Sequence, residues 1–400
     1  MNIMKICILT PRFPIPECGG DLLRINNIAR HLKSQGHELI LVSYTDQEYD
    51  LKTAAALYDK IYTTPFSRVS AVICSALFAM KRLPIQCGFY YSQSFNRLFG
   101  RVIATEKPDI YISHLLRMVP FLENYGVQDK SIIEMTDALS KTYSLSSKGK
   151  GSWIRRNVYK IEKRLIGGYE KYVVERYQKV VLVSSADIDF LKSTHHINGT
   201  SLVLHSNGVE CTEHLSHDYA PDKICFIGHM QSLQNQDAAI NFVENIFPLI
   251  LKKKHDAKFY IVGAHPPKRI QRLANGKNIF VTGFVDDINT FIADASVAVA
   301  PVRIAAGIQN KVLVAMGCSI PVVLTPLIAQ SIPELKDGEN CYITGEKEIF
   351  ADRCLSLMTN PTLRRQMALN GNAIVRAHYS WNQKLHGYLQ FPTSINKQKE

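Results

Sequence analysis

The stretch VAPVRIAAGIQNKVLVAMGCSIPVVLTP, residues 299–326, decides the fold because it joins two buried strands through a glycine-containing loop and a short helix. The continuous apolar runs VAVAP (297–301) and IPVVLTP (320–326) are bounded by Pro and Gly, which is typical of central parallel strands. Between them, Gly307 permits close approach of the backbone to a ligand, and a helix beginning near Ile308 offers unpaired N–H groups. A helix start at the carboxyl edge of a parallel sheet is a favourable place to bind a diphosphate. The stretch therefore predicts a nucleotide-type site without a Walker loop.

Strand-like and helix-like segments alternate twice along the chain. In the first half ICILTP, ELILVSY, IYISH, SIIEMTD and KVVLVSS are strand-like, and in the second half KICFIG, KFYIVG, IFVTG, ASVAVAP and PVVLT are. This alternation predicts an α/β protein with two doubly wound parallel-sheet domains. The pattern breaks at NGVECTEHLSHDYAPD, between Asn207 and Asp222, so we expect the domain boundary there. Ligands are then expected in a cleft between the domains, beyond the carboxyl ends of both sheets.

A formal net charge of +12 indicates an anionic partner, which could be a phosphorylated small molecule, an anionic membrane surface or a nucleic acid. The densest basic stretch is residues 148–179, where Ile154, Val158, Ile161 and Leu165 recur at helical spacing. An amphipathic basic helix of this kind either packs on the amino-terminal sheet with a solvated outer face or contacts anionic lipid headgroups. No nucleic-acid-binding module accompanies the charge, so we expect no nucleic-acid partner.

The chain carries nine cysteines without a CxxC pair, which predicts free thiols in a reducing compartment. No His/Cys cluster has the spacing of metal ligands, so we expect no metal site. The amino terminus lacks the features of a signal peptide. The longest apolar run, VSAVICSALFAM (residues 69–80), is too short to cross a bilayer and predicts a core helix, with a membrane-dipping segment as the alternative. We therefore expect a cytoplasmic protein, with the inner face of the membrane as an attachment surface.

Several strings of this sequence resemble GT-B-fold sugar-nucleotide glycosyltransferases, of the group 1 or family 4-like kind and of a branch associated with bacterial exopolysaccharide synthesis. APVRIAAGIQNKVLVAM resembles their donor-binding strand, loop and helix, and TPRFPIPECGGDLLRINNIARHLKSQGHELILVSY their opening strand, glycine loop and first helix. HSNGVE looks like their domain junction, and FIGHMQSLQNQDAAINFVENIFPLI, FYIVGAHPP and VTGFVDDI follow in the family's order. The resemblance covers most of the chain.

The resemblance implies a GT-B-like architecture, in which two Rossmann-like domains face each other across a cleft. Residues 1–206 would form the acceptor-binding domain and residues 207–375 the nucleotide-sugar domain. Residues 376–400 would carry a terminal helix that crosses back to the first domain. The implied activity is transfer of a sugar from a UDP- or GDP-sugar to a hydroxyl of a surface glycan or lipid-linked saccharide. The resemblance further implies that the anomeric configuration is retained and that no metal or other cofactor is required.

Two polar residues at strand ends are candidates for catalysis in the amino-terminal domain. His114 ends IYISH and could hydrogen-bond a hydroxyl of the donor sugar, and Asp137 ends SIIEMTD and could act as a base or orient the acceptor. The alternative for each is a satisfied polar residue at a strand end. Gly19 and Gly20, in the loop before the first helix, permit close approach of the backbone to a substrate or phosphate.

The carboxyl-terminal domain supplies the remaining candidates, which would bind the donor. Neutralisation of the diphosphate would come from a helix start and from basic side chains. Two backbone groups would read the base edge, and one histidine would stand near the phosphates. These candidates are Gly228, His229, Phe284, Val285, Arg303, Gly307, Ile308, Gln309, Asn310, Lys311 and Val314.

The sequence departs from the family's pattern where two glutamates are usual. Aligning LVAM with the family's LEAM puts Val314 at the position of the glutamate that holds the donor ribose, and Ala306 at the other. Both departures remove polar donor contacts. They motivate a second hypothesis, in which the chain is a catalytically degenerate nucleotide-sugar-binding subunit that partners an active transferase.

Overall fold

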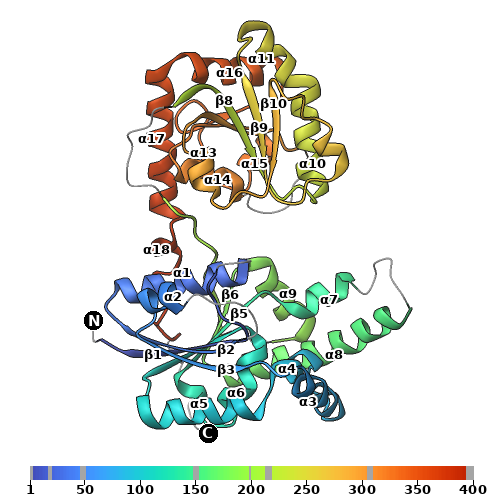
Figure 1. The fold of residues 1–400 in the computed structure, drawn as a ribbon, viewed down its shortest axis with the longest axis vertical. Helices are drawn as coiled ribbons and strands as arrows, with labels where there is room; N and C mark the ends of the chain where they lie inside the picture. Colours follow the sequence, from blue (N-terminus) through green and yellow to red (C-terminus); the bar gives the residue numbers. More distant parts are fainter. Residues whose placement is uncertain are drawn as a thin grey trace. The chain divides into compact units, whose positions relative to one another are not determined.

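The computed structural model describes most of the chain and divides it into two compact units (Figure 1). Unit 1 comprises Met1–Asn207 and Leu385–Glu400, and unit 2 comprises Gly208–Lys384. Each unit is described by itself below. The described residues are 3–16, 20–45, 51–146, 153–197, 200–211, 219–303 and 310–392, with the side chains of 142, 144–146 and 153–160 left aside.

Unit 1 is built on a parallel sheet of seven strands in the order β3-β2-β1-β4-β5-β6-β7. Its central strands are buried on both faces, which accounts for their nearly continuous apolar sequences. The strand order reverses between β1 and β4, and this switch point is where parallel sheets bind ligands at their carboxyl edge. The strands are β1 (Lys5–Thr10), β2 (Glu38–Thr45), β3 (Lys60–Pro65), β4 (Ile110–His114), β5 (Ser131–Thr136), β6 (Lys179–Leu182) and β7 (Leu202–Leu204).

The helices of unit 1 cover the two faces of this sheet (Figure 1). They are α1 (Gly20–Ser34), α2 (Leu51–Leu57), α3 (Arg68–Met80), α4 (Ile85–Tyr90), α5 (Gln93–Glu106), α6 (Val119–Glu123), α7 (Leu139–Ser146), α8 (Trp153–Arg176) and α9 (Ser185–His195), with short 3-10 turns at Leu116–Met118 and Gln128–Lys130.

Unit 2 repeats the plan with a parallel sheet of six strands in the order β10-β9-β8-β11-β12-β13. Its switch point lies between β8 and β11. The prediction of two doubly wound parallel sheets is confirmed. The strands are β8 (Ala220–Ile227), β9 (Lys258–Val262), β10 (Ile279–Gly283), β11 (Ala295–Ala300), β12 (Val322–Leu324) and β13 (Tyr342–Ile343).

The helices of unit 2 lie on both faces of its sheet, and α10 continues through a π-helical turn, η3, into α11. They are α10 (Leu233–Asn241), η3 (Phe242–Ile246), α11 (Phe247–Lys253), α12 (Lys268–Gln271), α13 (Ile288–Ile292), α14 (Asn310–Gly317), α15 (Pro326–Ala329), α16 (Lys347–Thr359), α17 (Pro361–His378) and α18 (Trp381–Lys384).

The segment that follows α18 belongs to unit 1, where it is held by side chains of two strands. The Nζ of Lys179 in β6 donates to the backbone carbonyls of Tyr388 and Gln390 at 2.6 and 2.7 Å. The hydroxyl of Tyr388 donates to Oε2 of Glu134 in β5 at 2.8 Å. The chain therefore leaves unit 1 after Asn207 and returns to it at Leu385.

Helix α3 corrects one prediction from the sequence. The run at residues 69–80 does form a helix, but it is not a core helix, because Val69, Val72 and Met80 are 72, 68 and 79% exposed. An apolar run without a polar face has no periodicity that would say which side is buried. None of the helices among the described residues has both the length and the apolar character that crossing a bilayer requires.

The predicted buried face of helix α8 was also wrong, because a different stripe of the helix is buried. Ile161 of the predicted apolar face is 57% exposed, whereas Glu162, Ile166 and Glu170 are buried. The stripe follows the two glutamates because each accepts hydrogen bonds from the backbone N–H groups at the start of another helix. Ile154 and Val158 lie outside the described side chains.

Candidate functional site

At the switch point of unit 2, two glycines allow the strand ends to approach helix α10. Gly228 follows β8, and its N–H donates to the carbonyl of Val262 at the end of β9 at 3.0 Å. A Cβ added at Gly263, whose φ is 157°, would lie 1.8 Å from the carbonyl oxygen of Gly228. A Cβ at Gly228 would lie 2.7 Å from the amide nitrogen of Asn235 in α10. A larger residue at position 263 would push the ends of β8 and β9 apart, and one at position 228 would displace the side chain of Asn235.

Lys311, in the first turn of α14, is a half-buried cation whose partner is an amide. Its Nζ donates to Oδ1 of Asn235, and the Nδ2 of Asn235 donates to the carbonyl of His229 at 3.0 Å. No carboxylate among the described residues forms an ion pair with Lys311. Burial lowers the pKa of Lys311 to about 8. A desolvated ammonium without a counter-ion is suited to accept an anionic ligand.

Arg303, by contrast, already has a carboxylate partner. Its Nη2 and Nε donate to the two carboxylate oxygens of Asp237 in α10 at 2.6 and 3.0 Å, and its side chain is 55% exposed. A phosphate would have to compete with Asp237 for this guanidinium. Asn235 and Asp237 lie inside α10, whose N-cap is Ser232.

A cavity of about 330 Å³ adjoins Arg303 at the carboxyl ends of β11, β12 and β13. Pro301, Thr325 and Gly345, which follow these three strands, line its floor, and Lys347 of α16 adds a second cation. The hydroxyl of Thr325 donates a hydrogen bond to the carbonyl oxygen of Val302 at 2.6 Å, which fixes its orientation. The cavity lies at the sheet edge where a ligand of unit 2 is expected.

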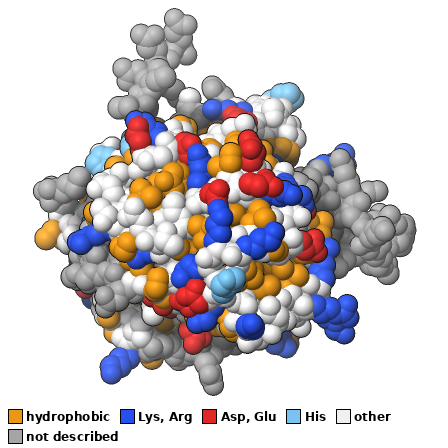
Figure 2. Space-filling view, turned by 90° about the horizontal axis from the view of Figure 1, so that it is seen from above, with side chains coloured by type: hydrophobic (Ala, Val, Ile, Leu, Met, Phe, Trp, Pro, Cys, Tyr) orange, Lys and Arg blue, Asp and Glu red, His pale blue; other side chains and the backbone are white. Residues whose placement is uncertain are grey.

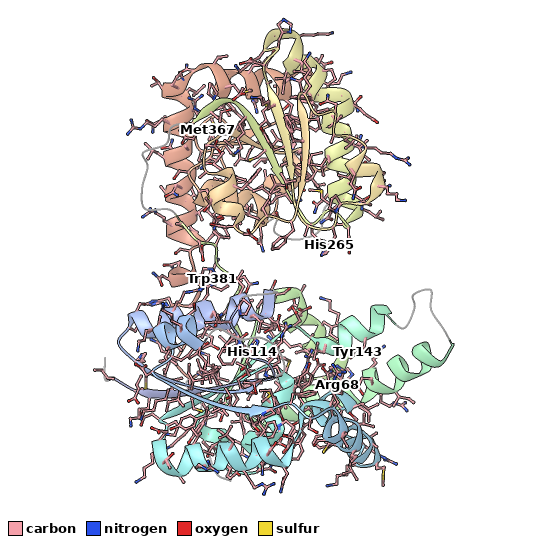
Figure 3. All side chains as sticks on the ribbon, in the orientation of Figure 1. Arg68, His114, Tyr143, His265, Met367 and Trp381 are labelled. Atoms are coloured by element: carbon pink, nitrogen blue, oxygen red, sulfur yellow. The ribbon has the colours of Figure 1, made fainter. Side chains whose placement is uncertain are left out.

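Two histidines stand at the ends of neighbouring strands β8 and β9. The ring of His229, which is exposed, lies 6.3 Å from that of His265, centroid to centroid. His265 is labelled in Figure 3 at the edge of unit 2 where these strands end. His265 was not among the predicted site residues, although its position after IVGA, at the carboxyl end of a strand, was the available signal.

The remaining predicted donor residues of unit 2 fall in three environments. Phe284 is 73% exposed and Val285 is half-buried, directly after β10. Asn310 is exposed at the described start of α14, and Val314 packs against the hydrophobic core of the unit. Asp287 caps α13, since its carboxylate accepts from the N–H of Asn289 at 2.9 Å. Gly307, Ile308 and Gln309, together with Ala306, lie outside the described residues.

In unit 1, three strand ends at the switch point carry buried polar atoms that have no hydrogen-bond partner among the described residues. They are Oγ1 of Thr10 at the end of β1, both ring nitrogens of His114 at the end of β4, and Oγ1 of Thr136 at the end of β5. β1, β4 and β5 are neighbours in the sheet. A buried polar group without a partner costs about 1–3 kcal/mol, so three at one sheet edge point to a bound ligand that would satisfy them.

His114, which is labelled in Figure 3, is fully buried in unit 1, and burial lowers its pKa to about 3. The carboxylate of Asp21 opposes this shift, and the guanidiniums of Arg24, Arg117 and Arg12 add to it. The ring is therefore neutral at physiological pH and can donate one hydrogen bond and accept another. Its carboxylate neighbour is itself engaged, because Asp21 accepts from Nη2 of Arg12 at 2.6 and 2.7 Å.

The other predicted catalytic residue, Asp137, directly follows β5, the neighbour of β4. Its side chain is exposed at the surface. The surrounding protein nevertheless removes part of the water around its carboxyl group, and this desolvation, together with the nearby carboxylate of Asp187, raises the pKa of Asp137. The sequence predicted that each of His114 and Asp137 lies at the end of a parallel strand, and the structure shows that these two strands are neighbours. Gly20 begins α1 beside them, whereas Gly19 lies outside the described residues.

A buried ion pair next to this edge was not predicted. Nε and Nη2 of Arg24 in α1 donate to the two carboxylate oxygens of Glu134 at 2.8 and 3.1 Å, and both side chains are fully buried. Nη1 of Arg24 donates to Oδ1 of Asn207 at 2.9 Å. The available signal was a single charge inside otherwise apolar segments, LLRINNI and SIIEMT. Within the described ranges, no group of three or more His, Cys, Asp or Glu side chains is placed to hold a metal ion.

Comparisons with known proteins bear on both units. Residues 221–360 match a family model described as Glycosyl transferases group 1. An uncharacterized 44.6 kDa protein in the cps region of Klebsiella pneumoniae is 21% identical over 394 residues, which cover 94% of this chain and 96% of that protein. The matched residues include β8, α10 and α14, the elements that carry the Asn235–Lys311 contact.

Three solved structures illustrate the similarity of fold. A glycosyltransferase from Rickettsia africae ESF-5 is 16% identical with a TM-score of 0.60, and all of both chains is covered. Anabaena Alr3699/HepE, solved with UDP-glucose, is 14% identical with a TM-score of 0.58, over 96% of this chain and 99% of that one. WaaG, described as a glycosyltransferase involved in lipopolysaccharide biosynthesis, is 12% identical with a TM-score of 0.57, over 96 and 99%.

Proposed function

On the premise that this chain is a group 1 glycosyltransferase of the GT-B fold, we propose that it moves a sugar from a UDP- or GDP-sugar to a hydroxyl of a surface glycan or lipid-linked saccharide. The observation that carries the donor part is Lys311, a desolvated ammonium held by the amide of Asn235 and without a carboxylate in the described residues. The solved complex of the Anabaena protein with UDP-glucose supports a nucleotide-sugar donor. The cps region that encodes the Klebsiella relative supports a surface-glycan acceptor.

The proposed reaction breaks the bond between the anomeric carbon and the diphosphate oxygen and forms a bond from that carbon to the acceptor oxygen. The nucleoside diphosphate leaves with the electron pair, and the charge of Lys311 stabilises it as it departs. With retention, the acceptor proton passes to the departing phosphate oxygen. We assign this course without a metal or other cofactor, because a buried cation and a helix start can supply the neutralisation.

We assign the remaining roles by unit. In unit 2, Arg303 would exchange Asp237 for a phosphate, and the backbone after β10 at Phe284 and Val285 would bind the base. In unit 1, neutral His114 would hydrogen-bond a sugar hydroxyl, and Asp137 would orient the acceptor or, in an inverting transfer, take its proton. We place the enzyme in the cytoplasm at the inner face of the membrane, with the basic segment 148–179 as a peripheral contact.

Lys311 provides the test, because its low pKa brings its charge change close to neutral pH. Below about pH 8 the ammonium is charged and binds the diphosphate; above it the amine is neutral and binds more weakly. Affinity for UDP or GDP, measured by calorimetry from pH 7 to 9.5, should therefore fall steeply above pH 8. Lys311→Met should weaken binding by about 10- to 100-fold, the value of one charged hydrogen bond, and abolish the pH dependence.

Lys336→Met, at an exposed lysine of the same unit, is the matched control and should change neither property. If Lys311→Met bound nucleotide like the wild type, the assignment of the diphosphate site would be wrong.

The second hypothesis, a degenerate nucleotide-sugar-binding subunit, rests on Val314. Its side chain packs against the core of unit 2 and supplies no carboxylate for a ribose. Both hypotheses require nucleotide binding, so turnover separates them. Release of sugar from the donor that binds, with a membrane extract as acceptor, supports the transferase. Tight binding of a donor without any turnover supports the subunit.

A further inference from the structure

Helix α3 packs on α4 through its smallest side chains. Ala71 is buried and Cys74 and Ser75 are half-buried, on the side of α3 that contacts α4. The contact is close, because a Cβ added at Gly88 of α4 would lie 2.5 Å from the carbonyl oxygen of Cys74. The inward face of α3 therefore consists of small residues together with Phe78, whose ring lies 5.4 Å from that of Tyr91, centroid to centroid, and packs against the core of unit 1.

The outward face of α3 carries large aliphatic side chains that are exposed. They recur at three- and four-residue intervals, which places them in one stripe along the helix. Burial of one such side chain gains about 1.5–3 kcal/mol, so the packing of unit 1 leaves a large favourable term unused on this face. The stripe consists of Val69, Val72, Ile73, Leu77 and Met80, which are 72, 68, 54, 47 and 79% exposed.

All the charged residues in the sequence around this stripe are basic. Residues 61–105, which contain α3, α4 and most of α5, carry five Lys and Arg residues and no Asp or Glu. Arg68 begins α3 (Figure 3), and Lys81 and Arg82 follow it, all exposed. On the face drawn in Figure 2, by contrast, acidic and basic side chains are interspersed. The stripe therefore lies between positive charges that no acid of its own segment balances.

Helix α8 adds further basic residues next to these elements. The carboxylate of Glu162 accepts from the N–H groups of Ile85 and Gln86 at 3.0 Å each, which fixes α8 against the start of α4. The next residues of α8, Lys163 and Arg164, are half-buried and exposed. α4 thus contacts both the inward face of α3 and the basic helix α8.

We propose that α3 lies in the headgroup region of an anionic bilayer, with the apolar stripe among the acyl chains and Arg68, Lys81 and Arg82 against lipid phosphates. An apolar face flanked by cations is the chemistry that binds such a surface. A helix of 13 residues is about 20 Å long, shorter than a bilayer core of about 30 Å, so it lies in the plane of the interface. A second copy of this chain is a poorer occupant, because an isologous contact would bring the same cations together.

Flotation with vesicles tests this, using the full chain without nucleotide. Wild-type protein should float with vesicles of phosphatidylcholine and phosphatidylglycerol, and weakly or not at all with phosphatidylcholine alone. The triple variant Val72→Gln/Ile73→Gln/Met80→Gln should lose at least about tenfold in partitioning, because three apolar side chains no longer enter the acyl region. Its melting temperature should not fall, since all three side chains are exposed.

Two further variants define the result. Leu233→Gln removes an equally exposed apolar side chain, 73%, from unit 2 and should float like the wild type. Arg68→Gln/Lys81→Gln should weaken flotation and its dependence on salt. The inference is overturned if wild-type protein does not float with anionic vesicles, or if the triple variant floats equally well. It is also overturned if wild-type protein is a dimer without lipid and the triple variant a monomer, because the stripe then joins two copies.

Nucleotide affinity, measured on the same purified proteins, tests the proposed function independently of flotation. Unchanged nucleotide affinity in the triple variant shows that a loss of flotation comes from α3 and not from a damaged donor site. Conversely, loss of nucleotide binding in Lys311→Met should leave flotation unchanged.

Discussion

His114 illustrates how a residue can be positioned at a cost to the folded state. Its ring is fully buried, both nitrogens lack partners, and burial lowers its pKa to about 3. A core residue selected for stability would be apolar at this position. The hydroxyls of Thr10 and Thr136 are also buried without a hydrogen-bond partner among the described residues, and they lie at the ends of the two strands that flank β4. Unsatisfied polar groups that gather at one sheet edge are best explained by a ligand that completes them.

We expect His114→Phe to separate stability from activity. Removal of two unpaired nitrogens should leave the free energy of unfolding unchanged or raise it by about 1–3 kcal/mol. Release of sugar from the donor should fall by about 10- to 100-fold, the value of one lost hydrogen bond to the substrate. Chemical denaturation and a donor-turnover assay measure the two effects.

The same variant has an acid-stability signature. The folded-state pKa of His114 lies below its unfolded value, so the unfolded chain binds the extra proton and wild-type stability declines as pH falls from about 6.5 towards 3. His114→Phe should be less sensitive over that window. A variant that unfolds more easily yet keeps full turnover would show that His114 is a structural residue.

At this scale the sequence predicts positions but not partners. Residues after strands, such as His114 and Asp137, are found from the alternating pattern because parallel strands end at one edge. The contacts of Lys311 with Asn235 and of Arg303 with Asp237 join residues far apart in the chain, so no local spacing indicates them. Whether a cation is paired decides its chemistry, and that is a tertiary property.

Among the elements, α8 shows why helical periodicity alone misplaced a buried face. Its stripe includes Glu162 and Glu170, which a hydrophobicity pattern assigns to solvent. Each carboxylate instead accepts N–H groups at a helix start, Glu162 from Ile85 and Gln86 and Glu170 from Ser140 at 3.1 Å. Helix starts carry unpaired N–H groups and a positive end of the dipole, so a buried carboxylate is stabilised there. The central strands, which are largely apolar, were predicted from their sequences, whereas the edge strands β3, β7 and β13 were not.

We expect Glu162→Ala to destabilise unit 1 through the start of α4. Two backbone N–H groups would lose their acceptor, which should lower the free energy of unfolding by about 1–3 kcal/mol in urea denaturation. Glu175→Ala removes an exposed glutamate of the same helix, in an ion pair with Lys171, and should cost at most about 0.5 kcal/mol. Equal effects of the two changes would mean that the contact of α8 with α4 contributes nothing specific.

For the molecule as a whole, the repeated strand–helix pattern predicts two parallel sheets because each α/β unit must bury both faces of its strands. What the pattern does not contain is the attachment of the chain's last segment to unit 1. That attachment depends on Lys179 and Glu134, each inside an apolar strand, and on Tyr388, in a segment without periodicity. Burial lowers the pKa of Lys179 to about 8, which reflects a cation whose partners are carbonyl dipoles. A charged residue inside an apolar strand, such as Lys179 or Glu134, is therefore the sequence feature that could have indicated this attachment.

We expect Tyr388→Phe to weaken unit 1 without affecting unit 2, because the lost hydroxyl donates to the fully buried carboxylate of Glu134. The carboxylate of Glu134 would keep Arg24 as a donor but lose the hydroxyl of Tyr388, which should lower the free energy of unfolding of unit 1 by about 1–2 kcal/mol. Hydrogen exchange followed by mass spectrometry resolves the two units, and protection should fall in β5 and β6 while β8 and β11 exchange as in the wild type. Tyr342→Phe, at the edge strand of unit 2, is the control. If exchange increased equally in both units, the segment after α18 would stabilise the chain as one cooperative body rather than unit 1 alone.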